Sequence, residues 1–239
     1  MKPLVVITGA SSGIGEELAK HFSEAGHALL LIARRLEKLE ALNLPNTMCK
    51  RVDVTDYAEF EAAVKEAEEK YGPVDCLINN AGLMQLGQFA DQDPKEWINM
   101  YDVNVKGLMY GMKTVVNGMM DRKHGTIFNI SSVAGKKMFP NHSVYCGTKF
   151  AVHAMSEAVR EEVSSHNIRV ITIAPGAVET ELLGHTTDDE IISGYEDWKK
   201  AIGGALKPED VANSIMFAYN QPQNVCLREI VLTATGQQA

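Results

Sequence analysis

The chain has 239 residues, of which 45% are hydrophobic and 23% charged. This is typical of a globular protein that is large enough to be stable without disulfide bonds or structural metal ions. Its formal net charge of −8 argues against nucleic acid or an anionic membrane as the main partner. The four cysteines form no C-x-x-C pair, and no run of about 18 apolar residues occurs. We therefore expect no metal site, no disulfide framework, no membrane span and a cytoplasmic location.

The first residues predict a strand, a glycine-rich turn and a helix in direct succession. The apolar run over residues 4–8 ends at Gly9, Gly13 and Gly15 follow, and helical apolar spacing then continues to Gly26. Glycines let the backbone approach a diphosphate, and a helix N-terminus offers free N–H groups. The spacing is G-x-x-x-G-x-G rather than G-x-G-x-x-G. We still predict a dinucleotide site here, in preference to a plain tight turn.

Two basic residues follow the second predicted strand. This strand covers residues 28–33, and Arg34 and Arg35 come directly after it. In dinucleotide-binding folds an acidic side chain at this place binds the ribose 2′-hydroxyl, whereas guanidinium groups suit a 2′-phosphate. The pair therefore predicts NADP(H) as the cofactor, unless both arginines are only solvated residues at the start of a helix.

Strands and helices alternate through the rest of the chain. We predict further strands over residues 46–54, 74–79, 125–131, 168–174 and 225–233, with helices over 56–71, 93–124, 143–166 and from Pro208 onward. This alternation predicts an α/β fold with a parallel sheet and helices on both faces. Ligands of such sheets bind beyond the carboxyl ends of the strands. The residues at those ends are the glycine turn, Arg34, Asp53, Asn80, Ser132 and Pro175.

Tyr145 and Lys149 stand four positions apart in a segment predicted to be helical, so they share one face. A nearby ammonium favours the ionised phenol, and a free Tyr with a pKa of about 10 is a poor proton donor or acceptor at neutral pH. The pattern Y-x-x-x-K is common by chance, so its weight comes from the other motifs.

Taken together, these motifs resemble the short-chain dehydrogenase/reductase family. The matching pieces are Thr8-Gly9 to Gly13-Ile14-Gly15, Asp53-Val54, Asn79-Asn80-Ala81-Gly82, Asn104, Ser132, Tyr145 with Lys149, and Pro175-Gly176 with Thr180. Ser132 precedes Tyr145 by the family's usual 13 positions. Residues 146–154 and 221–230 also resemble a narrower bacterial group of NADPH-dependent carbonyl reductases and NADPH-binding fluorescent proteins. The resemblance implies one NADP(H)-binding domain over residues 1–239, a Rossmann-type doubly wound, seven-stranded sheet of order 3-2-1-4-5-6-7, and a homotetramer or dimer.

The resemblance also implies residue roles. Tyr145 is expected as general acid toward a carbonyl, Ser132 as hydrogen-bond donor to the same oxygen, and Lys149 as the cation that lowers the pKa of Tyr145 and binds the nicotinamide ribose. Asn104 is expected to hold a water that connects Lys149 to solvent. The implied cofactor-binding residues are Gly9, Ser11, Ser12, Gly13, Ile14, Gly15, Arg34, Arg35, Asp53, Val54, Asn80, Ala81, Gly82, Tyr145, Lys149, Pro175, Gly176, Val178 and Thr180. Ser12 stands where many NADP-using members carry a basic residue, which leaves Arg34 and Arg35 to select the phosphate.

The sequence therefore predicts an NADPH-dependent reductase that converts a ketone or aldehyde to an alcohol, reversibly. The alternatives are a 3-oxoacyl-carrier-protein reductase, for which Lys136 and Lys137 hint at a docking patch, and an NADPH-binding fluorescent protein. We expect the substrate pocket to be lined by Met84, Ser132, Phe139, His142, Tyr145 and Trp198. Residues 181–205 are polar and irregular yet carry several apolar side chains, so we expect them to form a mobile lid.

Overall fold

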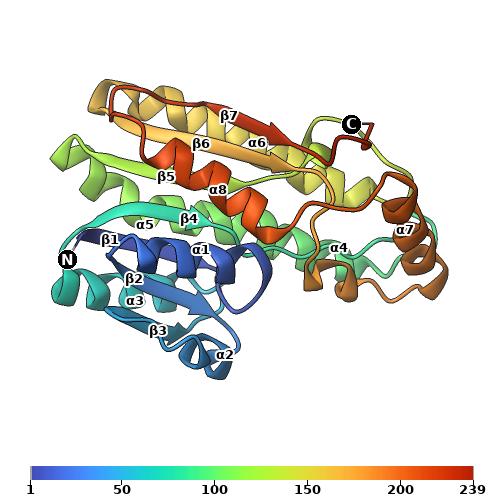
Figure 1. Cartoon of the computed structure of the whole chain (residues 1–239), viewed down its shortest axis with the longest axis horizontal. Coiled ribbons are helices and arrows are strands. Elements are labelled where there is room, and N and C mark those ends of the chain that lie inside the picture. Colours follow the sequence, from blue (N-terminus) through green and yellow to red (C-terminus); the bar gives the residue numbers. More distant parts are fainter. Residues whose placement is uncertain (1, 239) are drawn as a thin grey trace.

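The computed structural model describes residues 2–238, in which seven parallel strands form one sheet (Figure 1). The strands are β1 (Lys2–Thr8), β2 (His27–Ala33), β3 (Thr47–Arg51), β4 (Val74–Asn79), β5 (Gly125–Ile130), β6 (Ile168–Pro175) and β7 (Glu229–Leu232). Their order, β3-β2-β1-β4-β5-β6-β7, confirms the predicted one. The order reverses between β1 and β4, and ligands bind at such a switch point in open α/β sheets.

Helices cover both faces of the sheet (Figure 1). The helices α1 (Gly13–Glu24), α2 (Leu36–Ala41) and α8 (Pro208–Tyr219) pack on one face, and α3 (Tyr57–Tyr71), α5 (Leu108–Arg122) and α6 (Ser143–Val163) pack on the other. Successive residues of β2 alternate between the two cores: Leu29 joins the first and Leu30 the second. Burial on both faces explains why the sequence shows continuous apolar runs in place of alternation.

Two strands are shorter than predicted. β3 ends at Arg51 instead of residue 54, and β7 covers Glu229–Leu232 instead of residues 225–233. After β3, the Asp53 carboxylate accepts hydrogen bonds from the Thr55 backbone N–H at 3.0 Å and the Thr55 hydroxyl at 2.8 Å. This local turn offers the backbone an alternative to the ladder, and it leads the chain away from the sheet toward α3.

The long helix predicted over residues 93–124 is interrupted. It consists of α4 (Pro94–Tyr101), a π-helical stretch over Asp102–Gly107, and α5. Gly107 lies against Val54, since an added Cβ would be only 2.7 Å from Val54 Cγ2. An apolar stripe does not distinguish six residues of π-helix from α-helix, so the periodicity of the sequence could not show this change.

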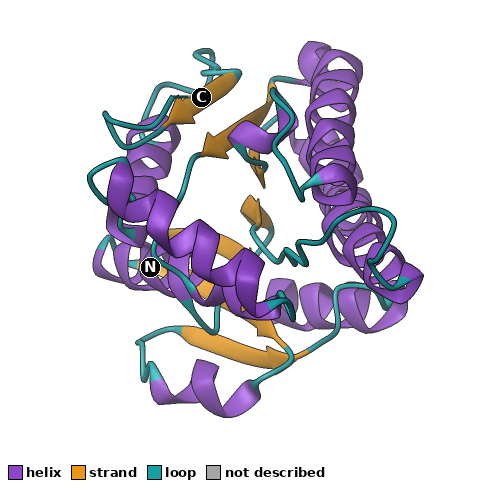
Figure 2. Cartoon of the chain, turned by 90° about the vertical axis from the view of Figure 1, so that its right-hand side faces the viewer, coloured by secondary structure: helices purple, strands orange, loops and turns teal. Residues whose placement is uncertain are grey.

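The segment over residues 181–205 is more regular than predicted. It contains a 3₁₀ turn over Glu181–His185 and the helix α7 (Asp189–Ala201), whose N-terminus is capped by Asp188. This helix lies at the right-hand end of Figure 1, the end that faces the viewer in Figure 2. Its residues Ile191 and Tyr195 pack against a small apolar cluster that includes Met84 and Tyr145. Whether the segment opens and closes stays a prediction.

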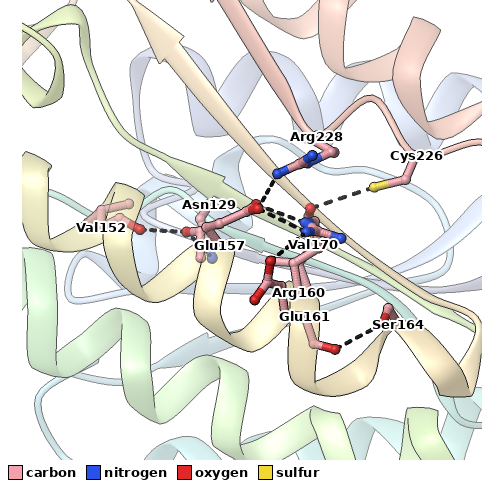
Figure 3. Close-up of polar contacts among 10 residues, drawn as sticks. Asn129, Val152, Glu157, Arg160, Glu161, Ser164, Val170, Cys226 and Arg228 are labelled. Atoms are coloured by element: carbon pink, nitrogen blue, oxygen red, sulfur yellow. Dashed lines mark hydrogen bonds and ion pairs between the residues drawn. The ribbon is translucent and has the colours of Figure 1, made fainter.

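The helix α6 is tied to the sheet by buried polar groups (Figure 3). The Asn129 amide on β5 donates to the Ser156 hydroxyl at 2.9 Å, which in turn donates to the Val152 carbonyl at 2.6 Å. On the outer side of the helix, Glu157 pairs with Arg228 from the segment before β7. These contacts hold α6 against β5 and against the segment before β7. They therefore help to set the position of the first turns of α6 relative to the carboxyl ends of the strands.

The described part of the chain holds no helix that is long and apolar enough to cross a membrane. In the same residues, 2–238, no cluster of three or more His, Cys, Asp or Glu side chains could hold a metal ion.

Candidate active and cofactor site

A cavity of about 870 Å³ opens at the carboxyl ends of the strands and extends from the turn after β1 to α7. It is lined by all residues of the predicted site except Gly15 and Asn104, which lie behind its wall. The cavity also takes in residues that the sequence did not single out as pocket residues, among them Leu182, His185 and Gln237. The two ends of the cavity differ in chemistry.

The glycine-rich turn after β1 forms a cradle at one end. Gly13 has a positive φ of 57°, and a Cβ there would lie 2.9 Å from the Thr180 methyl group. A Cβ on Gly15 would lie 2.4 Å from the Gly9 carbonyl oxygen, so a side chain at Gly15 would push α1 away from β1. Ser12 precedes the helix without capping it through its side chain, which leaves the first N–H groups of α1 available. The cradle fits the diphosphate of a dinucleotide.

Asn80 joins β4 to β1 beneath this cradle. Its side-chain amide donates to the Thr8 and Gly9 carbonyl oxygens, at 2.9 and 3.2 Å. The Thr8 hydroxyl oxygen accepts hydrogen bonds from the backbone N–H groups of Asn80 and Ala81, each at 3.0 Å. These contacts give the Asn80 side chain a structural part at the switch point of the sheet.

The two arginines after β2 have different surroundings. Arg35 donates to the hydroxyls of Ser11 and Ser12, at 3.1 and 3.0 Å, and lies 2.8 Å from the Glu181 carboxylate. Arg34 is exposed and lines the cavity, and the described residues give it neither a hydrogen bond nor an ion pair. Arg34 is thus the guanidinium that is free to bind an anionic group.

Lys38 adds a further cation that the sequence did not single out. Its ammonium lies 2.9 Å from the same carboxylate of Glu181. Hydrogen bonds from Lys38 and Arg35 lower the pKa of Glu181 to about 2, so this carboxylate is charged at every ordinary pH. Lys38 stands on α2, where charged residues are common, and only the fold brings it to Glu181, which lines the cavity although Lys38 does not.

Tyr145 and Lys149 lie on one face of α6 at the other end of the cavity. The Lys149 ammonium donates to the Ile130 carbonyl at 2.9 Å and lies 5.6 Å from the centroid of the Tyr145 ring. Burial lowers the pKa of Lys149 to about 8 and raises the pKa of Tyr145 well above its ordinary value, while a hydrogen bond with Ser132 lowers the latter in part. The expected lowering by Lys149 is therefore not the dominant effect in this geometry, and Tyr145 keeps its proton at neutral pH.

Ser132 and Asn104 differ in how far they are engaged. Besides its hydrogen bond with Tyr145, the Ser132 hydroxyl accepts from the Ala134 backbone N–H at 3.1 Å and makes a long contact, 3.4 Å, to the Pro175 carbonyl. The Asn104 side chain bonds both backbone groups of Leu83, at 2.7 and 2.8 Å, and donates to the Thr148 hydroxyl at 3.1 Å. This amide therefore ties the π-helical stretch to the loop after β4, and it has little capacity left for the expected water.

Aromatic side chains dominate the wall beyond Tyr145. The centroid of the His142 ring lies 5.7 Å from that of Phe139 and 6.2 Å from those of Tyr145 and Tyr195. Trp198 follows at 5.2 Å from Tyr195. Burial lowers the pKa of His142, so this imidazole is neutral at pH 7. Tyr195 belongs to the predicted lid, and its helical position next to His142 could not be read from an irregular pattern.

The C-terminal segment returns to the cavity beside β6. Gln237 is buried, lines the cavity, and accepts a hydrogen bond from the Ala177 backbone N–H at 3.0 Å. Its amide also lies directly against Gly176, where a Cβ would meet it at 2.2 Å. No motif or periodicity marks this glutamine in the sequence, because its position depends on where the chain travels after β7.

Comparisons with known proteins find similarity to dehydrogenases, oxidoreductases and reductases. The profile of the family described as short chain dehydrogenase matches residues 3–191. An uncharacterized oxidoreductase of Staphylococcus saprophyticus is 41% identical over 98% of this chain and 96% of its own length. A region of the glycine betaine reductase of Emericella nidulans is 42% identical over 96% of this chain but 18% of that protein.

Solved structures are similar over almost the whole chain. The closed form of a serine dehydrogenase complexed with NADP+ has a TM-score of 0.91 and 30% identity, covering 99% of this chain and 96% of that one. The protein ElxO with NADP bound has a TM-score of 0.85 and 29% identity, covering 97% and 96% of the two chains.

Proposed function

Because the chain belongs to the short-chain dehydrogenase/reductase family, we propose that it is an NADPH-dependent enzyme that reduces a small or medium ketone or aldehyde to the alcohol, reversibly. The observation that carries the proposal is the single cavity that places Ser132, Tyr145 and Lys149 at one end and the glycine cradle with Arg34 at the other. The glycine cradle and Arg34 would hold the phosphates of a dinucleotide, which would supply hydride-transfer chemistry in the same cavity as Tyr145.

In this proposal Tyr145 donates its proton to the carbonyl oxygen. The phenol is protonated at neutral pH and so carries the proton that reduction requires, while burial raises its pKa and makes release of that proton harder. Ser132 donates a hydrogen bond to the same oxygen, where negative charge develops. NADPH, when bound, would supply the hydride for the carbonyl carbon. Lys149, with a pKa of about 8, is mostly cationic at pH 7 and lies close enough to Tyr145 to stabilise the phenolate left behind.

The cofactor assignment rests on charge at the rim of the cradle. Arg34 is free, whereas Arg35 and Lys38 are paired with Glu181, so a 2′-phosphate would meet the unpaired guanidinium of Arg34. Similar solved structures are described as complexes with NADP or NADPH, which supports the same assignment. We assign Asp53 and Val54 to the adenine side and Pro175, Gly176 and Val178 to the nicotinamide side.

The alternatives have less support. Lys136 forms an ion pair with Glu229 at 2.7 Å, and the Lys137 ammonium lies 5.7 Å from the centroid of the Phe139 ring, so neither forms an open basic patch for an acidic carrier protein. A protein that only binds NADPH would not need Ser132 and Tyr145 together in a cavity. Among the similar proteins, one is named for glycine betaine and one for serine, which favours a small polar substrate.

We further propose a cytoplasmic homo-oligomer built from one domain. Tyr101, Met109 and Phe150 are large apolar side chains on α4, α5 and α6, and each is more than 40% exposed. Such a surface fits a closed symmetric assembly, with a tetramer or a dimer as the candidates.

A panel of aldehydes and ketones incubated with NADPH tests the proposed function. Loss of NADPH absorbance that depends on both the carbonyl compound and Tyr145 is the expected result. If the protein binds NADPH but reduces no member of a broad panel, the assignment as a carbonyl reductase is wrong. That result would support the alternative of a protein that only binds NADPH.

A further inference from the structure

Four aromatic side chains line the cavity next to Tyr145. Phe139 and His142 come from the segment before α6, and Tyr195 and Trp198 come from α7. The planes of neighbouring rings are inclined to one another by 32° to 63°, so the rings do not form parallel stacks. These inclined rings form a curved wall at one side of the position where a carbonyl would meet Tyr145.

Charged side chains at this end of the cavity are acidic or already paired. Asp188 and Glu190 line the cavity, and within residues 2–238 neither has an ion-pair partner, although Asp188 Oδ1 accepts the backbone N–H groups of Glu190 and Ile191 at the start of α7. Lys199 also lines it, but its ammonium lies 2.9 Å from the carboxylates of both Glu179 and Glu196. The local side chains around α7 therefore give this end a net negative charge.

The remaining cations are not placed to bind an anionic substrate here. The Lys149 ammonium is held by the Ile130 carbonyl at the reacting end, and the pKa of His142 is lowered by burial. Arg35 is paired with Glu181 at the other end of the cavity. Lys137 does not line the cavity, and its ammonium lies over the Phe139 ring. The Phe139 ring thus already contacts a cation of the chain.

We infer that the enzyme prefers carbonyl compounds that carry a cationic group, such as a quaternary ammonium, a few bonds from the reacting carbon. This inference rests on the proposed carbonyl reduction and names its substrate class. A cation is attracted by the faces of aromatic rings and by nearby carboxylates, and an ammonium without N–H groups needs no hydrogen-bond acceptor. A substrate with a carboxylate would meet Asp188 and Glu190, whereas the free guanidinium of the cavity, Arg34, lies at the end with Arg35 and the glycine cradle.

Binding of alcohols, the products of the reaction, tests the inference without relying on turnover. Calorimetry compares 2-(trimethylammonio)ethanol with its uncharged isostere 3,3-dimethylbutan-1-ol and with 3-hydroxypropanoate, each titrated into the protein with NADP+. We expect the cationic alcohol to bind about tenfold more tightly than the isostere, and the carboxylate to bind most weakly. The first two probes share shape and apolar surface, so their ratio reports charge alone.

Variants locate the preference. Tyr195→Leu is expected to reduce the tenfold ratio to about twofold, whereas Tyr195→Phe, which keeps the ring, retains it. Phe217→Leu is the matched control, because Phe217 is 62% exposed on α8 and does not line the cavity. If circular dichroism shows that Tyr195→Leu is unfolded, Trp198→Leu takes its place.

The outcomes separate this inference from the proposed function. Equal affinities for the two isosteres, tighter binding of the isostere or the carboxylate, or no measurable binding of any probe would overturn it. Turnover of uncharged aldehydes with NADPH is measured in parallel on the same preparation. An active protein without the preference contradicts only the inference, and a protein that prefers the cation but reduces nothing contradicts only the proposed function.

Discussion

Arg35 and Glu181 form an ion pair of 2.8 Å that joins the end of β2 to the segment leading into α7. The same carboxylate also forms an ion pair with Lys38. Of the three cations near the cradle, Glu181 therefore neutralises two and leaves Arg34 unpaired. The end of the cavity that holds the glycine cradle is therefore linked through Glu181 to the segment that leads into α7. This link explains the direction of several expected effects.

Replacing Glu181 with Gln is expected to strengthen NADPH binding several-fold. The carboxylate is charged at every ordinary pH, because Lys38 and Arg35 lower its pKa to about 2, and its removal frees both cations for a phosphate. Titration of NADPH fluorescence measures the dissociation constant. Affinity for NADH should hardly change, since it has no 2′-phosphate. Weaker NADPH binding by the variant would mean that Glu181 positions the cations instead of competing for them.

The unmodified protein is expected to bind NADPH about ten- to a hundred-fold more tightly than NADH. A charge-assisted hydrogen bond contributes roughly 1.5–3 kcal/mol, and Arg34 is the guanidinium free to make one. Arg34→Ala should remove most of the difference. Lys65→Ala, which removes an exposed cation of α3 outside the cavity, is the matched control. Equal dissociation constants of the unmodified protein for the two cofactors would refute this view of Arg34.

Tyr145→Phe keeps the ring and removes the proton donor. Positioned acid catalysis is worth about 10²–10⁴-fold, so kcat for reduction should fall by at least this factor. Cofactor affinity should be close to that of the unmodified protein, and fluorescence titration provides that control. Nearly normal turnover by the variant would show that another group supplies the proton.

Lys149 is expected to make the cofactor-free protein more stable as the pH rises from about 8 toward the ordinary lysine value. Burial lowers its pKa to about 8, so over this range the unfolded chain binds more protons than the folded one. Denaturant unfolding at several pH values measures the effect. Lys149→Met should be more stable than the unmodified protein at neutral pH, and the difference should shrink through this range. A constant difference would mean that Lys149 keeps an ordinary pKa.

The sequence predicts the parts of the fold that depend on local patterns. The buried strands appear as apolar runs because both of their faces are covered, and the i, i+4 spacing places Tyr145 and Lys149 on one face of α6. The order of the strands came from the family resemblance. The π-helical stretch at Asn104 could not be predicted, because the apolar spacing of six residues does not distinguish it from an α-helix.

Other parts of the site depend on contacts between distant segments. Lys38 reaches the cavity through Glu181, which is 143 positions away in the chain, and Gln237 reaches it through Ala177. No local pattern encodes either contact. The pKa of Tyr145 likewise depends on burial of the phenol in the folded chain, which raises it, and Lys149 is not among the groups that shift it.

Residues 181–205 are expected to open and close over the substrate. The segment is anchored at its start by the ion pair between Glu181 and Arg35, and it buries Tyr195 only partly, while much of its surface is polar and exposed. Few buried apolar contacts favour local opening, and closure would exclude water from the hydrogen bonds to a carbonyl. Amide hydrogen exchange should therefore be fast in the free protein and slower with NADPH and a substrate analogue. The strand β1, buried along most of its length, serves as the internal reference, since its exchange should be slow in both states. Equally strong protection of α7 in both states would mean that the segment is fixed structure, and that the walls near Met84 and His142 choose the substrate without any movement.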